Sequence, residues 1–557
     1  MMIQSGRGVG RSYSFLCGLV VSGLLALFVA SYVTADDKVD EKYPLQREQA
    51  VLERDLNSDD YQKVLETMIP TDLAAEWQRV AAPDNFLAFA REHGGPAKID
   101  ADPALKRAYQ HRRDVARKFL EIMQAEYEKR NVKPPFDLED LDAVLEPLLE
   151  GDAAAAETSL PETSVRVLLP APGSEKQWPR FRGPSGQGTV YAENVPLTWS
   201  TTQNIGWKIE LPGRGNSSPI VWDDKIFVTA EKNDRQDRVL LCYSRTDGQL
   251  LWESVAPRPE STEQLYWKNT YASSTPVTDG ARVYAMFGNA GLVCCDFDGN
   301  FVWQKNLGVF QMAHGPGTSP VLYRDLVIVV QDQNQQDSLM VACDKTTGEI
   351  VWRQQRPRSV CWSTPVVVRV DDHDELLYNG SSTVIGYDPA TGDEIWRVNG
   401  SSIEAVPTIV VGHGLIFSAS GRVGPLLAIR PGGTGDVTAT HLFWNKQRIA
   451  AHVPSPAYAE GMLFQANDMG ILTCFDAATG QTLWQTRLRG KFSMSPLVIG
   501  DKILISSEEG LSTVFKVADE FEAVAENDLA ETIYATPAVL DGQIIFRTDA
   551  HLISIAE

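Results

Sequence analysis

The stretch Ala342-Cys-Asp344-Lys-Thr-Thr347-Gly348-Glu-Ile-Val-Trp352 holds the pattern that decides the fold. An apolar run ends at an Asp, a turn of the form Asp-x-x-Thr-Gly follows, and a second apolar run ends at a Trp. Asp side chains accept hydrogen bonds from backbone N–H groups in turns, and Gly adopts positive φ without steric cost. The pattern therefore predicts two antiparallel strands joined by a tight turn.

The same turn and strand recur from Asp388 through Gly392 to Trp396, and from Asp476 through Gly480 to Trp484. A tryptophan ends this strand in seven units: Trp207, Trp252, Trp303, Trp352, Trp396, Trp444 and Trp484. Prolines open the units, mostly 40–50 residues apart: Pro219, Pro276, Pro320, Pro365, Pro407, Pro456, Pro496 and Pro537. Self-similarity at this period is typical of propellers. We therefore predict an all-β, eight-bladed β-propeller with four strands per unit.

The two ends of the repeat region are offset from each other. The last unit begins at Thr536-Pro537 and stops at Ile555 without a fourth strand, whereas the strand around Trp207 precedes any opening strand. That early strand has the right pattern to complete the last blade. Ring closure removes exposed sheet edges, which otherwise pair with other chains. We expect the strand around Trp207 to close the ring.

The first 177 residues follow other patterns. Arg7 and Arg11 precede an apolar run over residues 15–33, and small residues follow as Val33-Thr34-Ala35. This predicts an export signal over residues 1–35, either cleaved or kept as a membrane anchor. Apolar residues at helical spacing predict a helical region over residues 36–150. Residues 151–177, rich in Ala, Glu, Pro, Ser and Thr, read as a linker to a propeller over residues 178–557.

Charge and cysteines narrow the range of partners and cross-links. A formal net charge of −22 repels phosphate backbones and excludes nucleic acid as a partner. The same charge argues against adhesion to anionic membranes, so we expect membrane contact only through the N-terminal segment if it is not cleaved.

Cys294 and Cys295 fall in the third strand of a unit. Neighbours in a strand point to opposite faces, so this pair is predicted to remain two free thiols that pack as small apolar groups.

The segment from Ala342 to Trp352 resembles the tryptophan-docking motif of pyrroloquinoline-quinone (PQQ)-dependent dehydrogenases. The same repeat occurs in BamB-type propellers of bacterial outer-membrane assembly. The segment Trp178-Pro-Arg-Phe-Arg-Gly-Pro-Ser-Gly-Gln-Gly188 resembles the start of PQQ-like repeat proteins of planctomycete-type bacteria. The resemblance covers about residues 178–557 and implies the fold. It does not select a function, because both enzymes and non-catalytic scaffolds use this repeat.

Membership of the dehydrogenases would imply PQQ and Ca²⁺ at the mouth of an axial funnel, with Glu and Asn ligands, a carboxylate base and a stacking Trp. Residues just ahead of the opening prolines should line this funnel. The candidates are Asn216, His314, Trp362, Glu404, His452 and Tyr534. Trp362, Glu404 and Asn216 would imitate the stacking residue and the Ca²⁺ ligands, but no acidic base joins them. We therefore assign no catalytic residue, metal or cofactor.

These observations lead to one expected function and two alternatives. We expect an exported, non-catalytic propeller in the periplasm, cell envelope or extracellular space that binds an envelope protein or an extended ligand. The first alternative is a PQQ- and Ca²⁺-dependent quinoprotein dehydrogenase that oxidises alcohols or sugars. The second is a carbohydrate-binding propeller.

Overall fold

The computed structural model describes residues 160–161, 163–312, 314–421, 424–447 and 449–557. These residues belong to one compact unit, Ser159–Glu557. The predicted export signal over residues 1–35 and the predicted helical region over residues 36–150 lie outside the described residues. Within the described ranges, no helix combines the length and the apolar character that a membrane crossing requires.

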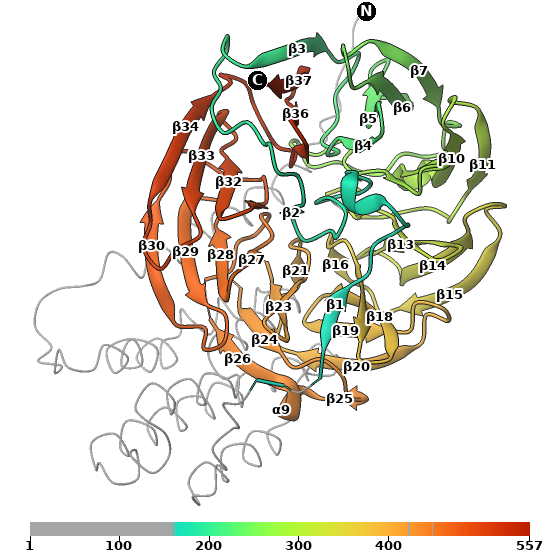
Figure 1. Ribbon diagram of the computed structural model, residues 1–557. Helices are drawn as coiled ribbons and strands as arrows, with labels where there is room; N and C mark the ends of the chain where they lie inside the picture. The colour runs from blue at the N-terminus through green and yellow to red at the C-terminus, as the bar shows by residue number, and fades with distance from the viewer. Residues whose placement is uncertain (1–159, 162, 313, 422–423, 448) are drawn as a thin grey trace, which may run out of the picture. The chain divides into compact units, whose positions relative to one another are not determined.

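Eight blades, each built on four antiparallel strands, surround a common axis, which confirms the predicted eight-bladed propeller (Figure 1). Blades 4 and 7 carry extra short strands in addition to these four. Within each blade the first strand is innermost. Blade 1 comprises β4 (Ile220–Trp222), β5 (Lys225–Lys232), β6 (Asp237–Ser244) and β7 (Leu250–Val255). Blade 2 comprises β8 (Val277–Thr278), β9 (Arg282–Met286), β10 (Leu292–Asp296) and β11 (Phe301–Lys305). Blade 3 comprises β12 (Val321–Tyr323), β13 (Leu326–Gln331), β14 (Ser338–Asp344) and β15 (Ile350–Arg356). Blade 4 comprises β17 (Val366–Val370), β18 (His373–Asn379), β19 (Thr383–Tyr387) and β20 (Glu394–Asn399).

The second half of the ring repeats this order. Blade 5 comprises β22 (Val410–Gly412), β23 (Leu415–Ala419), β24 (Leu426–Ile429) and β26 (Leu442–Lys446). Blade 6 comprises β27 (Ala457–Ala459), β28 (Met462–Ala466), β29 (Ile471–Asp476) and β30 (Thr482–Arg487). Blade 7 comprises β31 (Leu497–Ile499), β32 (Lys502–Ser506), β33 (Leu511–Lys516) and β34 (Ala523–Asp528). Blade 8 comprises β35 (Ala538–Leu540), β36 (Gln543–Arg547), β37 (His551–Ala556) and β3 (Ile205–Glu210).

Several short elements lie outside this four-strand pattern. They are β1 (Val165–Val167), the 3-10 helices Ser174–Lys176 and Gly288–Ala290, β2 (Thr189–Val190), β16 (Val360–Cys361), β21 (Glu404–Ala405), β25 (Gly435–Asp436) and α9 (Thr438–His441). β16 lies in the connection between blades 3 and 4, and β21 lies in the connection between blades 4 and 5. These two strands pair with each other in parallel.

The strand around Trp207 closes the ring as the offset of the repeats predicts. β3 pairs with β37 in antiparallel register, with Lys208 opposite Ile553 and Ile209 opposite Leu552. Leu211 N–H donates to Ala550 O at 2.8 Å just beyond the strand. The first and last described strands of the ring are therefore joined by a backbone ladder, and blade 8 is built from both ends of the propeller.

Tryptophans at the third position of six outer strands join their blade to the next one. Their indole N–H groups donate to a backbone carbonyl in the last turn of the following blade, at 2.9–3.2 Å: Trp207 to Arg245, Trp252 to Phe297, Trp303 to Lys345, Trp352 to Pro389, Trp444 to Ala477 and Trp484 to Ala518. The Trp303 ring also covers Gly348, where an added Cβ would lie 2.6 Å from the ring. Gly348 is therefore required for two reasons. It adopts a φ of +74°, and its missing side chain leaves room for the tryptophan of the preceding blade.

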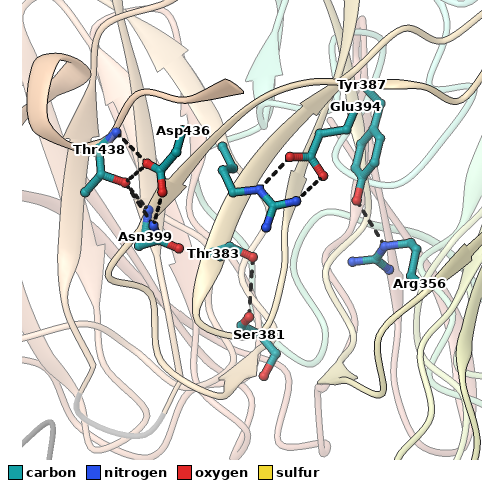
Figure 2. A network of polar contacts seen from close by, with 9 residues as sticks. Arg356, Ser381, Thr383, Tyr387, Glu394, Asn399, Asp436 and Thr438 are labelled. Atoms are coloured by element: carbon teal, nitrogen blue, oxygen red, sulfur yellow. Dashed lines mark hydrogen bonds and ion pairs between the residues drawn. The ribbon is translucent and has the colours of Figure 1, made fainter. Parts of the chain in front are cut away.

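Trp396 departs from this rule. Its indole N–H donates at 2.7 Å to Glu375 Oε2 of its own blade, and the side chain is fully buried in the apolar layer between blades 4 and 5. Blade 5 lacks an Asp-x-x-Thr-Gly turn, and an insertion takes its place. Within it, β25 pairs in parallel with the outer strand β20. Figure 2 shows Asp436 of this insertion bonded to Asn399 and Thr438.

A ring of hydroxyl groups links the innermost segments around the axis. The backbone N–H of one blade donates to the Ser or Thr hydroxyl of the next at 2.9–3.3 Å: Ser218 to Thr275, Thr275 to Ser319, Ser319 to Thr364, Thr408 to Ser455, Ser455 to Ser495 and Ser495 to Thr536. In five of these six, the donor immediately precedes an opening Pro. In blade 5 Thr408 takes this place, so the opening position is Ile409 and not Pro407 as the sequence suggested. Glu404 therefore lies five residues ahead of the opening position instead of three.

The six described cysteines are free and buried. Cys294 and Cys295 are consecutive residues of β10, opposite Tyr284 and Val283 of β9. Burial raises the pKa of the Cys242, Cys361 and Cys474 thiols to about 12, which keeps them protonated and unreactive. These buried thiols therefore pack in the core in the way that small apolar side chains do.

Candidate functional site

The two ends of the axis differ in their connections. Turns between first and second strands lie at one end, here called the turn face. Loops from one blade to the next lie at the other end, here called the loop face. This follows from the antiparallel order, because a strand entered from one face leaves towards the other.

Residues 177–190 run across the axis from the turn face and are almost completely buried. Trp178 forms a bridge with Val221 of β4, and its side chain is 1% exposed. Pro179 O accepts from Thr278 N–H of blade 2 at 2.9 Å. Gln177 bonds Asp223 in the first turn of blade 1. Residues 177–190 are therefore an axial insert held by the neighbouring blades.

The insert continues to the opposite blades. Arg182 donates to Pro456 O of blade 6, and Gln187 bonds both Ile409 O and Val411 N–H of blade 5. β2 then pairs in parallel with β31 of blade 7. Burial lowers the pKa of Arg182 to about 9. The axial insert is thus bonded to blades on both sides of the ring, and Figure 1 shows β2 inside the ring of blades.

On the loop face, a loop over residues 256–276 between β7 and β8 reaches across to distant blades. Lys268 Nζ lies 2.7 Å from Glu508 Oε2 of blade 7, whose other oxygen accepts from Ser493 at 2.6 Å. Lys268 Nζ also lies 5.5 Å from the ring centre of Tyr534. Asn216, a predicted funnel residue, donates to Lys268 O at 2.8 Å. Two predicted residues, Asn216 and Tyr534, therefore meet around a lysine that was not among the predicted funnel residues.

The other predicted funnel residues form two separate pairs. The His314 and Trp362 rings meet edge to face with centroids 5.7 Å apart, and Trp362 donates to Gly315 O at 2.8 Å. His452 Nε2 lies 3.5 Å from Glu404 Oε2. The structure thus groups the six candidates as Asn216 with Tyr534, His314 with Trp362, and Glu404 with His452.

These groups do not fit a PQQ and Ca²⁺ centre. Asn216 already donates to a backbone carbonyl in the Lys268 loop, and Glu404 faces the imidazole of His452. No cluster of three or more His, Cys, Asp or Glu side chains that suits a metal occurs among the described residues. Ca²⁺ takes six to eight oxygen ligands. The described side chains therefore do not gather the ligand set that the dehydrogenase resemblance implies.

The tip of the 256–276 loop is exposed and aromatic. Trp267 is 66% exposed and Tyr266 is 44% exposed, with ring centroids 5.7 Å apart. The Tyr266 ring lies 5.5 Å from His314. These residues were not predicted from the sequence, because they belong to no repeat position. A Tyr-Trp-Lys run in a loop between two blades was the available signal.

A family model described as "Outer membrane protein assembly factor BamB" matches residues 172–265, 236–442 and 381–520. BamB of Yersinia pestis is 23% identical over 303 residues, covering 52% of this chain and 68% of BamB. BamB of Legionella pneumophila (strain Paris) is 26% identical over 213 residues, covering 36% and 51%. Tetrathionate hydrolase of Acidianus ambivalens is 30% identical over 128 residues, covering 20% of this chain and 24% of the hydrolase. The matched part of this chain thus covers between about a quarter and about two thirds of the length of these relatives.

A solved structure with a TM-score above 0.5 shows the same fold. Quinohemoprotein alcohol dehydrogenase from Comamonas testosteroni aligns with a TM-score of 0.53 at 11% identity, covering 69% of this chain and 81% of the dehydrogenase. BamB from Moraxella catarrhalis aligns with a TM-score of 0.47 at 15% identity, covering 62% and 95%. Because the family model matches more than half of the 557 residues, this chain belongs to the BamB family of PQQ-repeat β-propeller proteins.

Proposed function

We propose that this protein is a non-catalytic scaffold of the cell envelope that binds a partner protein through the aromatic tip of its 256–276 loop. Membership of the BamB family and the export signal predicted over residues 1–35 support the envelope location. The exposed pair Tyr266 and Trp267 carries the binding proposal. Aromatic residues are enriched at the energetic centres of protein interfaces.

The loop presents these aromatic rings from a fixed base. Lys268 is paired with Glu508, and Asn269 donates to His314 O and to Pro316 O at 2.6 and 2.9 Å. These bonds tie the loop to blades 2 and 7 directly beside the exposed tip. A preformed loop loses less conformational entropy on binding than a mobile loop does, so more of the contact energy appears as affinity.

Site-specific photocross-linking in intact cells tests this function. The full-length chain carries a photoreactive amino acid at Trp267, and a matched control carries it at Leu251, which is 42% exposed on the outer strand β7. We expect one reproducible envelope protein to cross-link at Trp267 and not at Leu251. The combined change Tyr266→Ser and Trp267→Ser should reduce co-purification of that protein at least tenfold. Equal cross-linking from both positions contradicts the proposal.

The dehydrogenase alternative has its own discriminating measurement. Full-length protein is titrated with PQQ in the presence of Ca²⁺, and both quinone absorbance and dye reduction with alcohols are followed. The scaffold proposal expects neither saturable absorbance change nor dye reduction. Saturable binding that is lost in Glu404→Gln would support the dehydrogenase instead.

A further inference from the structure

The inner edge of the extra strand β1 offers unused backbone groups. Leu168 N–H donates to Val367 O, and Asp371 N–H donates to Ser164 O, so the even-numbered residues of this segment bond blade 4. In an antiparallel pair, the alternate residues point their N–H and C=O groups to the other side. The backbone N–H and C=O groups of Val165, Val167 and Leu169 therefore point away from β17. Among the residues that the structure describes, no hydrogen bond reaches their N–H groups.

This open edge borders a cleft of about 640 Å³ on the turn face. One wall is residues 165–169, and the other is residues 185–191, which include β2. The floor is formed by Val410 and Val411 of blade 5 and Tyr458 of blade 6. Tyr191 and Leu169 at the rim are 53% and 40% exposed. The cleft is therefore a trough with a strand edge along one side and an apolar floor.

The ring already holds two extended segments in this manner. β1 adds to the innermost strand of blade 4, and β2 adds to the innermost strand of blade 7. Blades 5 and 6 lie between them, and the cleft lies over these two blades. An unpaired edge is a template for another strand. The geometry of this face thus favours a third extended segment beside β1.

The shape of the cleft selects its occupant. The sheet edge of a second folded propeller cannot reach β1, because residues 185–191 form the opposite wall of the cleft and face β1 across it. A single extended strand fits, and at about 3.3 Å per residue the edge from Val165 to Leu169 spans roughly 13 Å. Arg166 and Glu175 carry opposite charges along the same cleft, so no net charge is selected.

We propose that the cleft beside β1 binds an extended segment of another polypeptide, with alternating apolar side chains, by adding it to β1 as a further strand. Main-chain hydrogen bonds supply the affinity in such β-augmentation, and pockets for alternate side chains supply the specificity. This site lies on the opposite face from Trp267. It extends the scaffold proposal without depending on the loop-face partner.

Fluorescence anisotropy with a labelled peptide tests the proposal. The probe is fluorescein-Lys-Val-Thr-Val-Thr-Val-Lys-amide, added to the full-length chain. A second peptide has the same side chains but methyl groups on the five inner backbone nitrogens. We expect saturable binding of the first peptide and at least tenfold weaker binding of the methylated one. Equal binding of both, or no binding of the first at about 1 mM protein, overturns the proposal. The second result is also expected if a segment of this chain fills the cleft.

Two substitutions at one position locate the site. Val167→Pro removes an N–H that points into the cleft and leaves the bonds of Arg166 and Leu168 to β17 in place. Val167→Thr keeps the backbone and the side-chain shape. Peptide binding should fall at least tenfold in Val167→Pro and stay within threefold in Val167→Thr, and unchanged binding in Val167→Pro sinks the assignment. Trp267 cross-linking should persist in both variants, which separates this site from the proposed loop-face function.

Discussion

At the scale of single residues, the repeat works through pairs that span two blades. Trp303 of blade 2 donates to Lys345 O and covers Gly348 of blade 3. Asp344 accepts from Thr346 and Thr347 N–H at 2.8 Å each, which lowers the pKa of its carboxyl and closes the turn beneath the indole. The Asp, Gly and Trp of the motif are thus parts of one joint between neighbouring blades.

Two glycine substitutions separate the two structural requirements at Gly348, which are a positive φ and the absence of a side chain beneath the Trp303 ring. Gly348 has φ +74° and Gly542 has φ +72°, but an added Cβ meets the Trp303 ring only at Gly348 and finds nothing within 4 Å at Gly542. Both changes to Ala should cost about 1–2 kcal/mol for the left-handed backbone. Gly348→Ala should lose a further 1–3 kcal/mol, approximately, because the indole must move.

Urea-induced unfolding of the two variants provides the measurement. A free energy of unfolding that falls equally in Gly348→Ala and Gly542→Ala would show that the tryptophan makes no demand on the turn glycine.

The sequence predicted these turns because each contains its whole signal in a few adjacent residues. It did not predict that Trp396 bonds Glu375, because Glu375 lies on the second strand of blade 4 and has no counterpart in the repeat. The funnel candidates were also chosen by position alone. The grouping of Asn216 with Tyr534 depends on Lys268, whose loop crosses from blade 1 to Glu508 of blade 7, a contact between residues 240 apart in the sequence.

At the scale of elements, one strand decides whether the ring is closed. The missing fourth strand of the last unit revealed β3, and its pairing with β37 is as expected. The short strands β1 and β2 were missed. Two or three residues are too few for a detectable alternation, and β1 lies in a stretch whose composition suggested a linker.

Proline substitutions in β3 test closure by this strand. Leu211 bonds Ala550, so the antiparallel register turns the N–H of Ile209 towards β37 and that of Glu210 away. Ile209→Pro should destabilise the protein by about 1–3 kcal/mol, because it removes a ladder hydrogen bond and leaves the carbonyl opposite without its donor. Glu210→Pro should cost far less.

Thermal unfolding monitored by circular dichroism, with light scattering for aggregation, compares these two variants. A larger loss in Glu210→Pro than in Ile209→Pro would contradict the register.

At the scale of the whole molecule, the axial insert determines which surfaces of the propeller are open to partners. Residues 177–190 occupy the axis from the turn face, so the open surfaces are the two faces with their loops and clefts. The exposed aromatic tip lies on the loop face, and the free edge of β1 lies on the turn face. The arrangement suits a protein that holds polypeptides on its faces.

Hydrogen exchange over the axial insert tests this account most directly. Trp178 N–H is bonded to Val221 O, Gly188 N–H to Arg182 O, and both residues are buried. Amides of residues 178–188 should therefore exchange as slowly as those of the innermost strands β4 and β31. Exchange as fast as in the exposed turn at residues 233–236 would show that the insert does not fill the axis.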